Sequence, residues 1–356
     1  MNKCLFAILF MTFQMLSFFS SAQLLSDEEL ELEEEYVSLN EAMKNPKMVY
    51  RLNLKGQNMT ALTPEIVKLV NLQELSLSNN KLSTLPMALT KLKYLQKLNL
   101  SWNKFTRVPD VVIKMPHIRC LDFSDNKLVE FPNSLSALPN LEILKLDRNR
   151  ISSIPNTIEN FKALQILSLW FNKISKLPPQ LGQLHNLTEL KVANNHLQAL
   201  PKEIGNLKKL QKFYLWSNQL RSLPIEIGRL KNLEVLALKW NMLTTIPSEI
   251  GKLEMLTELN LANNRIINLP KEIGNLAHLE KLYLSDNNIT MLPSEIGNLK
   301  ALTKLDLWNN KLNKMPQTIS KLRLLKDFDL GYNPLNAAEK AKIKKMLPKA
   351  KIMFTN

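Results

Sequence analysis

The chain has 356 residues, of which 45 % are hydrophobic and 22 % are charged. This balance is typical of a folded protein and excludes a wholly disordered chain. Two cysteines, Cys4 and Cys120, are too few for a disulfide-stapled scaffold. The only long apolar run is N-terminal, which excludes a polytopic membrane protein. The net charge of +15 predicts a basic surface that attracts acidic partners, but it names none.

Residues 1–22 have the pattern of a secretory signal peptide, with Lys3 before an apolar stretch and small residues at Ser20 and Ala22. We expect cleavage near Ala22, which leaves a protein that is secreted, periplasmic or on the outer surface of a bacterial cell. The alternative is an uncleaved segment that anchors the chain in the membrane. After cleavage Cys120 is the only thiol, and an exported chain without disulfides fits a bacterial envelope.

Residues 23–47 form an acidic leader, with eight acidic residues and two lysines. Two interpretations are open: a solvated segment, or an acidic arm that shields the basic remainder of the chain. Ser38 and Glu41 have the spacing of a capping box, which predicts a short helix ending near residues 45–46. We expect this helix to cap the N-terminal end of the structure that follows.

From Met48 the sequence repeats every 23 residues without an insertion, giving thirteen repeats over residues 48–346. A repeat of this length is typical of a solenoid, in which each unit is stabilised by stacking on its neighbours. The repeats begin at Met48, Asn71, Tyr94, His117, Asn140, Ala163, Asn186, Lys209, Asn232, Met255, His278, Ala301 and Leu324.

We number the positions of each repeat as columns 1 to 23. Leucines in columns 5 and 7 predict a short strand, and successive strands would stack into one parallel sheet. Proline in column 16 ends each strand segment, and glycine in column 20 predicts tight convex turns or close packing of coils. Column 10 predicts a buried ladder of asparagines that bond to backbone groups: Asn80, Asn103, Asn126, Asn149, Asn172, Asn195, Asn218, Asn241, Asn264, Asn287, Asn310 and Asn333.

The last repeat merges into a C-terminal segment, residues 337–356. Residues 337–346 have the pattern of an amphipathic helix whose apolar residues would cover the final coil. A last extended piece is expected at residues 351–354. We predict that this segment caps the C-terminal end.

The pattern LxxLxLxxNxLxxLPxxIxxL resembles the leucine-rich repeat family and covers about 85 % of the chain by the repeats counted above. Its LPxEIGxL variant, as in residues 200–207, is similar to repeats of secreted bacterial leucine-rich repeat proteins and of Scribble-type scaffolds. The resemblance implies an α/β solenoid: a horseshoe with a parallel inner sheet, short helical, 3-10 or irregular convex turns, and helical caps at both ends. It also implies a binding function.

Columns 4, 6, 8 and 9 are expected on the concave face, where the fold leaves residue identity free. All five tryptophans fall in columns 8 and 9, which favours a ligand-binding surface. The candidate residues are Trp102, Trp170, Phe171, Tyr214, Trp216, Trp240, Tyr283, Trp308, Lys145, Arg148, Lys191, Lys212 and Lys239. The alternative is that these rings only stack along the solenoid and stabilise adjacent coils.

Column 11 carries five consecutive cations that would form a basic edge: Lys81, Lys104, Lys127, Arg150 and Lys173. Such a row could bind a linear polyanion, for example an acidic glycan. The alternative is that these side chains only keep an exposed position soluble.

The sequence contains no arrangement of residues that indicates catalysis. The four histidines are scattered, so no metal site is expected, and no phosphate-binding glycine motif indicates a nucleotide. We therefore expect a non-enzymatic monomer without cofactors that binds a protein partner through its concave face. The alternatives are a surface protein that binds glycans or other polyanions, and a passive structural protein of the envelope.

Overall fold

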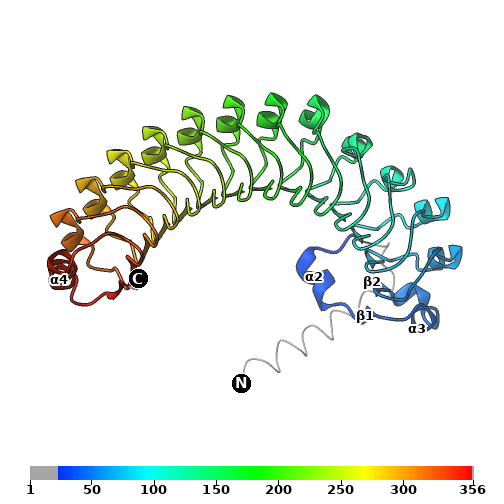
Figure 1. Ribbon diagram of the computed structural model, residues 1–356. Helices are drawn as coiled ribbons and strands as arrows, with labels where there is room; N and C mark the ends of the chain where they lie inside the picture. The colour runs from blue at the N-terminus through cyan, green and yellow to red at the C-terminus, as the bar shows by residue number, and fades with distance from the viewer. Residues whose placement is uncertain (1–22, 355–356) are drawn as a thin grey trace, which may run out of the picture.

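The computed structural model describes residues 23–354, which form a curved solenoid with one parallel sheet along its inner side (Figure 1). The fifteen strands follow one another in chain order, as the leucine-rich repeat pattern predicts. They are β1 (Glu35–Tyr36), β2 (Arg51–Asn53), β3 (Glu74–Ser76), β4 (Lys97–Asn99), β5 (Cys120–Asp122), β6 (Ile143–Lys145), β7 (Ile166–Ser168), β8 (Glu189–Lys191), β9 (Lys212–Tyr214), β10 (Val235–Ala237), β11 (Glu258–Asn260), β12 (Lys281–Tyr283), β13 (Lys304–Asp306), β14 (Asp327–Asp329) and β15 (Lys351–Met353).

Each strand from β2 to β14 occupies columns 4 to 6 of its repeat. Neighbouring strands pair at an offset of one repeat, so that Leu75 lies beside Leu98. The middle residue of each strand points into the apolar core, which runs as one cluster through all the repeats. Side chains of the same column therefore form continuous rows across the inner face.

Short 3-10 helices occupy the convex side, opposite the sheet (Figure 1). Most start directly after the column-16 proline, whose extended backbone turns the chain away from the strand, as with Pro224 before η9. They are η1 (Pro46–Met48), η2 (Pro64–Lys68), η3 (Met87–Lys91), η4 (Val112–Lys114), η5 (Asn133–Ala137), η6 (Asn156–Asn160), η7 (Pro179–Gln183), η8 (Lys202–Asn206), η9 (Ile225–Arg229), η10 (Ser248–Lys252), η11 (Lys271–Asn275), η12 (Ser294–Asn298) and η13 (Gln317–Lys321).

The column-20 glycines are explained by close packing. A Cβ at Gly228 would lie 2.5 Å from the carbonyl oxygen of Glu249 in the next repeat, and the other five column-20 glycines show the same conflict. None of the six has a positive φ, so backbone freedom is not the reason for glycine there. Six successive convex helices therefore approach one another more closely than any side chain allows.

Each column-10 asparagine links neighbouring repeats through its side-chain amide. Asn218 donates from Nδ2 to the carbonyls of Val192 and Leu215, and its Oδ1 accepts the N–H of Leu197. The same arrangement recurs in the other repeats, and all twelve asparagines are at most 8 % exposed. Because the strands are short, these amides satisfy the backbone groups that the sheet leaves unpaired.

The C-terminal helix α4 (Ala337–Met346) follows the last repeat and packs next to η13. Its Ile343 is fully buried and belongs to the core cluster, and Leu347 follows it there. Strand β15 then pairs with β14 and completes the sheet.

The N-terminal helix α3 (Leu39–Ala42) contributes the buried Ala42 to the core. The capping box expected at Ser38 is wrong, because the Ser38 side chain makes no capping bond. The reciprocal bonds form instead between Ser26 and Glu29 at the start of α2 (Asp27–Leu32). Both sites have the same four-residue spacing, so the spacing alone does not distinguish them.

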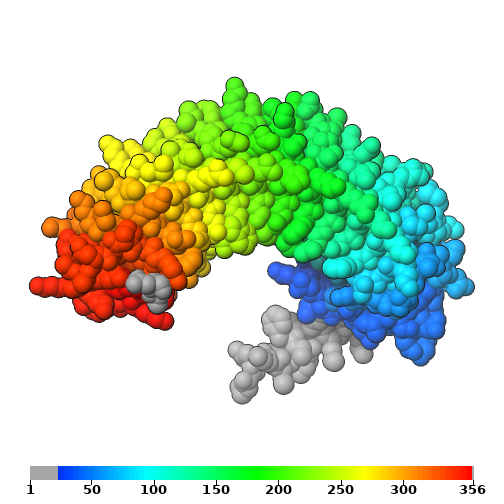
Figure 2. Space-filling view, in the orientation of Figure 1, coloured from blue at the N-terminus to red at the C-terminus, as the bar shows by residue number. Residues whose placement is uncertain are grey.

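Residues 23–34, which include α2 and are called the arm below, lie across the concave face of the first repeats (Figures 1 and 2). This part of the leader is therefore held against the inner face, although most of its side chains are exposed to solvent. The arm bonds to residues of β4 and to column-3 side chains on the same inner face. The predicted signal peptide, residues 1–22, lies outside the described residues. Within residues 23–354, no helix has the length and apolar character needed to cross a bilayer.

Candidate ligand-binding surface

The inner face of the sheet presents rows of side chains whose identity differs from repeat to repeat. In β9, Phe213 in column 5 is fully buried, whereas Lys212 and Tyr214 on either side are exposed to different degrees. The same alternation holds along the sheet, because a strand turns successive side chains to opposite faces. The concave face is therefore a continuous surface of columns 4, 6 and 8.

Column 9, where the chain leaves each strand, has a left-handed backbone in every repeat. The twelve residues from Asn79 to Tyr332 in this column have φ between 49° and 57°, and Gly56 takes the position in the first repeat. Glycine, asparagine and aspartate tolerate this conformation best, and for a bulky residue it costs about 1 kcal/mol or more. Four aromatic residues nevertheless occupy it and are 44–59 % exposed: Trp102, Phe171, Trp240 and Tyr332.

Four rings in repeats 6 to 9 form a contiguous group, which we call the aromatic patch: Trp170, Phe171, Trp216 and Trp240. The ring centroids of Trp170 lie 5.1 Å from Phe171 and 5.7 Å from Trp216, and Trp216 lies 6.4 Å from Trp240. Trp170 and Trp216 are two repeats apart, and the small side chain of Ala193 stands between them in their column. The rings therefore contact one another in edge or tilted geometry, while Phe171 and Trp240 stay open to solvent.

Two cations lie over the rings of the aromatic patch. The Arg148 guanidinium carbon is 4.8 Å from the Trp170 ring and 4.7 Å from the Phe171 ring. The Lys239 Nζ is 4.2 Å from the Trp240 ring. These distances are those of cation–π contacts, which hold the long side chains against the surface.

A second group of aromatic residues lies nearer the C-terminal end. Trp308 and Tyr332 are in edge contact at 5.2 Å, and Lys304 Nζ lies 5.2 Å from the ring of Tyr283. In repeats 7 and 8, beside the aromatic patch, Lys191 Nζ lies 5.7 Å from the ring of Tyr214.

Two of the predicted residues lie apart from these groups. Within the described chain, Trp102 makes no ring contact with another aromatic residue and is 59 % exposed. Lys145 lines a pocket near the N-terminal end, beside Cys120 and Asp122. The columns of the repeat therefore predicted one continuous surface of candidate residues. In the structure these residues form separate groups on the concave face.

Asp147 is a half-buried support of the aromatic patch, and its role was not predicted from the sequence. Its carboxylate accepts bonds from the Ser168 hydroxyl at 2.5 Å and from the Trp170 N–H at 2.7 Å. Burial raises the pKa of Asp147 above its ordinary value, although these two bonds partly offset the effect. Asp147 fixes the backbone from which the Trp170 ring projects.

Two buried donors at the aromatic patch have no partner within residues 23–354. They are Nε1 of Trp170 and Nδ2 of Asn194. Buried polar atoms are normally hydrogen-bonded, because leaving one unpaired costs about 1–3 kcal/mol. Both atoms are closed off from solvent by the side chains around them, so a ligand would reach them only if a ring of the patch moved.

The five column-11 cations of the basic edge are all exposed, and none of them forms an ion pair with any residue described in the structure. Their backbone N–H groups bond to the preceding repeat, as Lys104 does to Leu82. The side chains are thus free to face solvent along one edge of the first six repeats.

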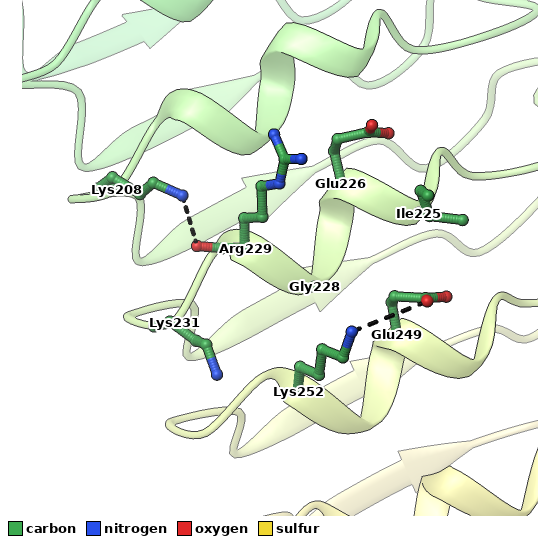
Figure 3. Close-up of a pocket in the computed structure, with 8 residues that line it drawn as sticks. All are labelled: Lys208, Ile225, Glu226, Gly228, Arg229, Lys231, Glu249 and Lys252. Carbon is green, nitrogen blue, oxygen red and sulfur yellow. Dashed lines mark hydrogen bonds and ion pairs between the residues drawn. The ribbon is translucent and has the colours of Figure 1, made fainter.

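The convex side has an open pocket of about 410 Å³ between η8, η9 and η10, shown in Figure 3. Lys208 Nζ donates to the carbonyl of Arg229, and Lys252 pairs with Glu249 at 3.8 Å. Burial, together with the neighbouring Arg229 and Lys231, lowers the pKa of Lys208. Since its walls are repeated surface residues that largely pair with one another, this pocket offers a ligand less than the concave face does.

Within residues 23–354 no group of three histidine, cysteine, aspartate or glutamate side chains lies close enough to hold a metal ion. Cys120 is a free thiol in β5, and burial raises its pKa, which disfavours the reactive thiolate.

Two family models match the sequence and together span residues 48–333. The model described as a leucine-rich repeat region matches residues 132–218, 190–269, 213–287 and 268–333. The model described as a leucine rich repeat matches residues 48–105 and 93–151. A comparison with curated proteins found no match.

Among solved structures, the chain is similar to a leucine-rich repeat protein of Leptospira interrogans, with 33 % identity over 91 % of this chain and 100 % of that one, at a TM-score of 0.71. It is also similar to a plant peptide hormone receptor in complex with RGF2, with 27 % identity over 88 % of this chain and 52 % of the receptor, at a TM-score of 0.70. An internalin of Listeria monocytogenes shares the fold, with 21 % identity over 80 % of this chain and 87 % of that one, at a TM-score of 0.66.

Proposed function

Because the chain belongs to the leucine-rich repeat family, whose members generally act as protein-binding scaffolds without enzymatic activity, we propose that it binds a protein partner through the concave aromatic patch. Export by the predicted signal peptide, and a place outside the cytoplasm of a bacterial cell, belong to the same proposal. A structural relative that carries a peptide ligand, the plant hormone receptor in complex with RGF2, supports it.

The observation that carries the proposal is the presence of large aromatic residues at left-handed positions. Asparagine or glycine in column 9 would fit the backbone better, yet Phe171 and Trp240 stand there with about half of their surface exposed. Exposed aromatic residues beside cations are typical anchors of protein interfaces.

The test is a capture experiment with residues 23–356 and a variant that carries Trp170→Ala, Trp216→Ala and Trp240→Ala. A matched control carries Ile225→Ala, Met255→Ala and Met291→Ala, which remove exposed apolar side chains that lie outside the concave columns. We expect a protein from envelope or host-cell extract to be retained by the native chain and by the control, and lost from the tryptophan variant. Equal retention by all three folded proteins would contradict the proposal.

The basic edge supports a second candidate, binding of an acidic glycan or other polyanion, because its five cations are exposed and unpaired within the described chain. Such binding weakens steeply with ionic strength, whereas binding through the aromatic patch depends on it less. Retention on heparin that disappears with Lys81, Lys104, Lys127 and Arg150 changed to glutamate would favour the polyanion. Unchanged retention would exclude the edge as its site.

A further inference from the structure

The arm is held on the concave face partly through its own backbone. The Leu25 N–H donates to Oε1 of Gln73 at 2.9 Å, and Nε2 of Gln73 donates to the carbonyl of Gln23 at 2.9 Å. Gln96 donates from Nε2 to the carbonyl of Leu25 at 2.9 Å and to Gln73 at 2.8 Å. Both glutamines are buried with the arm in place, and the bond between their side chains holds the two amides in position for a peptide backbone. Such bonds do not depend on the side chains of the bound segment.

Charge supplies the second part of the contact. One carboxylate oxygen of Asp27 lies 2.8 Å from Lys97 Nζ, and the other lies 3.7 Å from the Arg119 guanidinium. Arg51 donates to the backbone carbonyls of Glu31 and Glu33 at the far end of α2. The leader has a net charge of −6, whereas residues 48–356 carry 44 lysines and arginines against 24 acidic residues, a net charge of +20. Within the groove, Arg51 and Arg119 also pair with Glu74 and Glu142 at 3.0 Å, so Lys97 is the cation that favours an acidic segment most directly.

The apolar part of the contact is small. Leu30 is buried against the inner face, but Leu32 is 72 % exposed and Leu24 is also open to solvent. A segment held by one buried side chain and a few polar contacts opens at a low free-energy cost. Beside the arm, a pocket of about 330 Å³ runs along the inner face past Lys97 and Cys120 to Lys145, so the groove extends beyond the residues that fill it.

We propose that the concave face of repeats 1 to 4 is a second binding groove, for an acidic peptide segment of another protein, and that the arm is its exchangeable intramolecular occupant. The glutamines bind the backbone of the segment, Lys97 and Arg119 bind its carboxylate, and the pocket toward Lys145 accepts residues that the arm lacks. Because the arm is tethered, its effective concentration is high, and a partner must bind the groove more tightly than the arm does to replace it.

The test uses a variant, called the opened chain, in which the arm is released from the concave face and the residues of the groove are unchanged. A chain with Asp27→Lys and Leu30→Asp keeps Gln73, Gln96, Lys97 and Arg119 intact and leaves the repeats untouched. The probe is a fluorescein-labelled peptide with the sequence of residues 23–35, followed by fluorescence anisotropy. We expect it to bind the opened chain at least tenfold more tightly than the native chain. Binding should be lost when Lys97→Glu is added to the opened chain, and when the probe itself carries Asp27→Lys.

Cys120 reports independently whether the arm has left, because it lines the pocket beside the arm. We expect a thiol reagent to label Cys120 severalfold faster in the opened chain than in the native chain, and the probe peptide to slow the labelling of the opened chain again. Equal affinity of the probe for the two chains would overturn the proposal. The proposal would also be overturned if the opened chain had a native circular dichroism spectrum and fast labelling of Cys120 but did not bind the probe. An opened chain whose Cys120 is labelled at the native rate would overturn it as well.

Discussion

The first four repeats and repeats 6 to 12 share one backbone but differ on both faces. The concave face of the first group has small and polar residues such as Ser76, Asn99 and Asp122, and the arm of the same chain covers part of it. The concave face of the second group is open and carries the aromatic patch. The columns that the fold requires are the same in both groups, so the difference lies in the columns that the fold leaves free.

The convex sides differ as well. Repeats 6 to 11 have glycine in column 20, whereas repeats 2 to 5 have Thr90, Ile113, Ser136 and Glu159 there. Where glycine occurs, the next repeat comes too close for a Cβ. The comparison therefore assigns tight convex packing and an aromatic inner face to the same part of the solenoid.

The largest expected effect comes from filling the close contact on the convex side. Gly228→Ala would place a methyl group 2.5 Å from the Glu249 carbonyl oxygen and 2.8 Å from its Cβ. Since backbone has to shift to admit it, we expect a loss of about 2–3 kcal/mol in the free energy of unfolding, as in overpacked cores. Urea unfolding followed by circular dichroism measures it. The matched change Ser136→Ala in repeat 4 adds no atom and should stay within about 0.5 kcal/mol; equal midpoints for both variants would refute the packing argument.

The sequence predicted the architecture well because the repeat imposes the same local rules thirteen times. Leu75 and Leu98 share a column and pair in neighbouring strands, and the column-16 proline marks the start of most 3-10 helices. The contact of Trp170 with Trp216 also follows from their common column, once Ala193 is seen between them.

What the sequence did not reveal depends on contacts between distant segments. The place of the arm rests on Gln73 and Gln96, which look like ordinary polar residues of column 3 until the backbone of Leu25 is brought to them. Likewise, the asparagines and aspartates of column 9 indicate a left-handed backbone, but Trp102 and Phe171 in the same column do not. The role of Asp147 follows only from the position of the next strand.

A smaller effect measures how much stability the fold loses by placing an aromatic residue at the left-handed backbone of column 9. Trp102→Asn puts a residue that tolerates the left-handed backbone at a position where the ring is 59 % exposed. We expect the free energy of unfolding to rise by about 1 kcal/mol. The reverse change in the preceding repeat, Asn79→Trp, should lower it by a similar amount, as measured by urea unfolding. A loss of stability in Trp102→Asn would show that the ring stabilises its own repeat.

The smallest effect concerns pH and the arm. The bond and the charge of Lys97, together with the charge of Arg119, lower the pKa of Asp27. Because the pKa is lower with the arm bound than with the arm free, this contact is fully present above the ordinary aspartate pKa of about 4 and is lost as the pH falls through the lower value. The arm should therefore stay bound at neutral pH and loosen only in acid.

Labelling of Cys120 with 4,4′-dithiodipyridine, which reacts in acid, measures this loosening. The ratio of the rate in the Asp27→Lys, Leu30→Asp chain to the rate in the native chain removes most of the titration of the thiol itself, because Asp27 is the smallest of the contributions to the pKa of Cys120. We expect this ratio to be severalfold at neutral pH and to fall toward one once the pH drops below the ordinary aspartate pKa of about 4, over a range where circular dichroism shows both chains folded. A ratio that does not change with pH would mean that Asp27 does not hold the arm. The covered end of the concave face would then be held by the backbone bonds of Gln73 and Gln96, the contacts of Arg51 and the burial of Leu30.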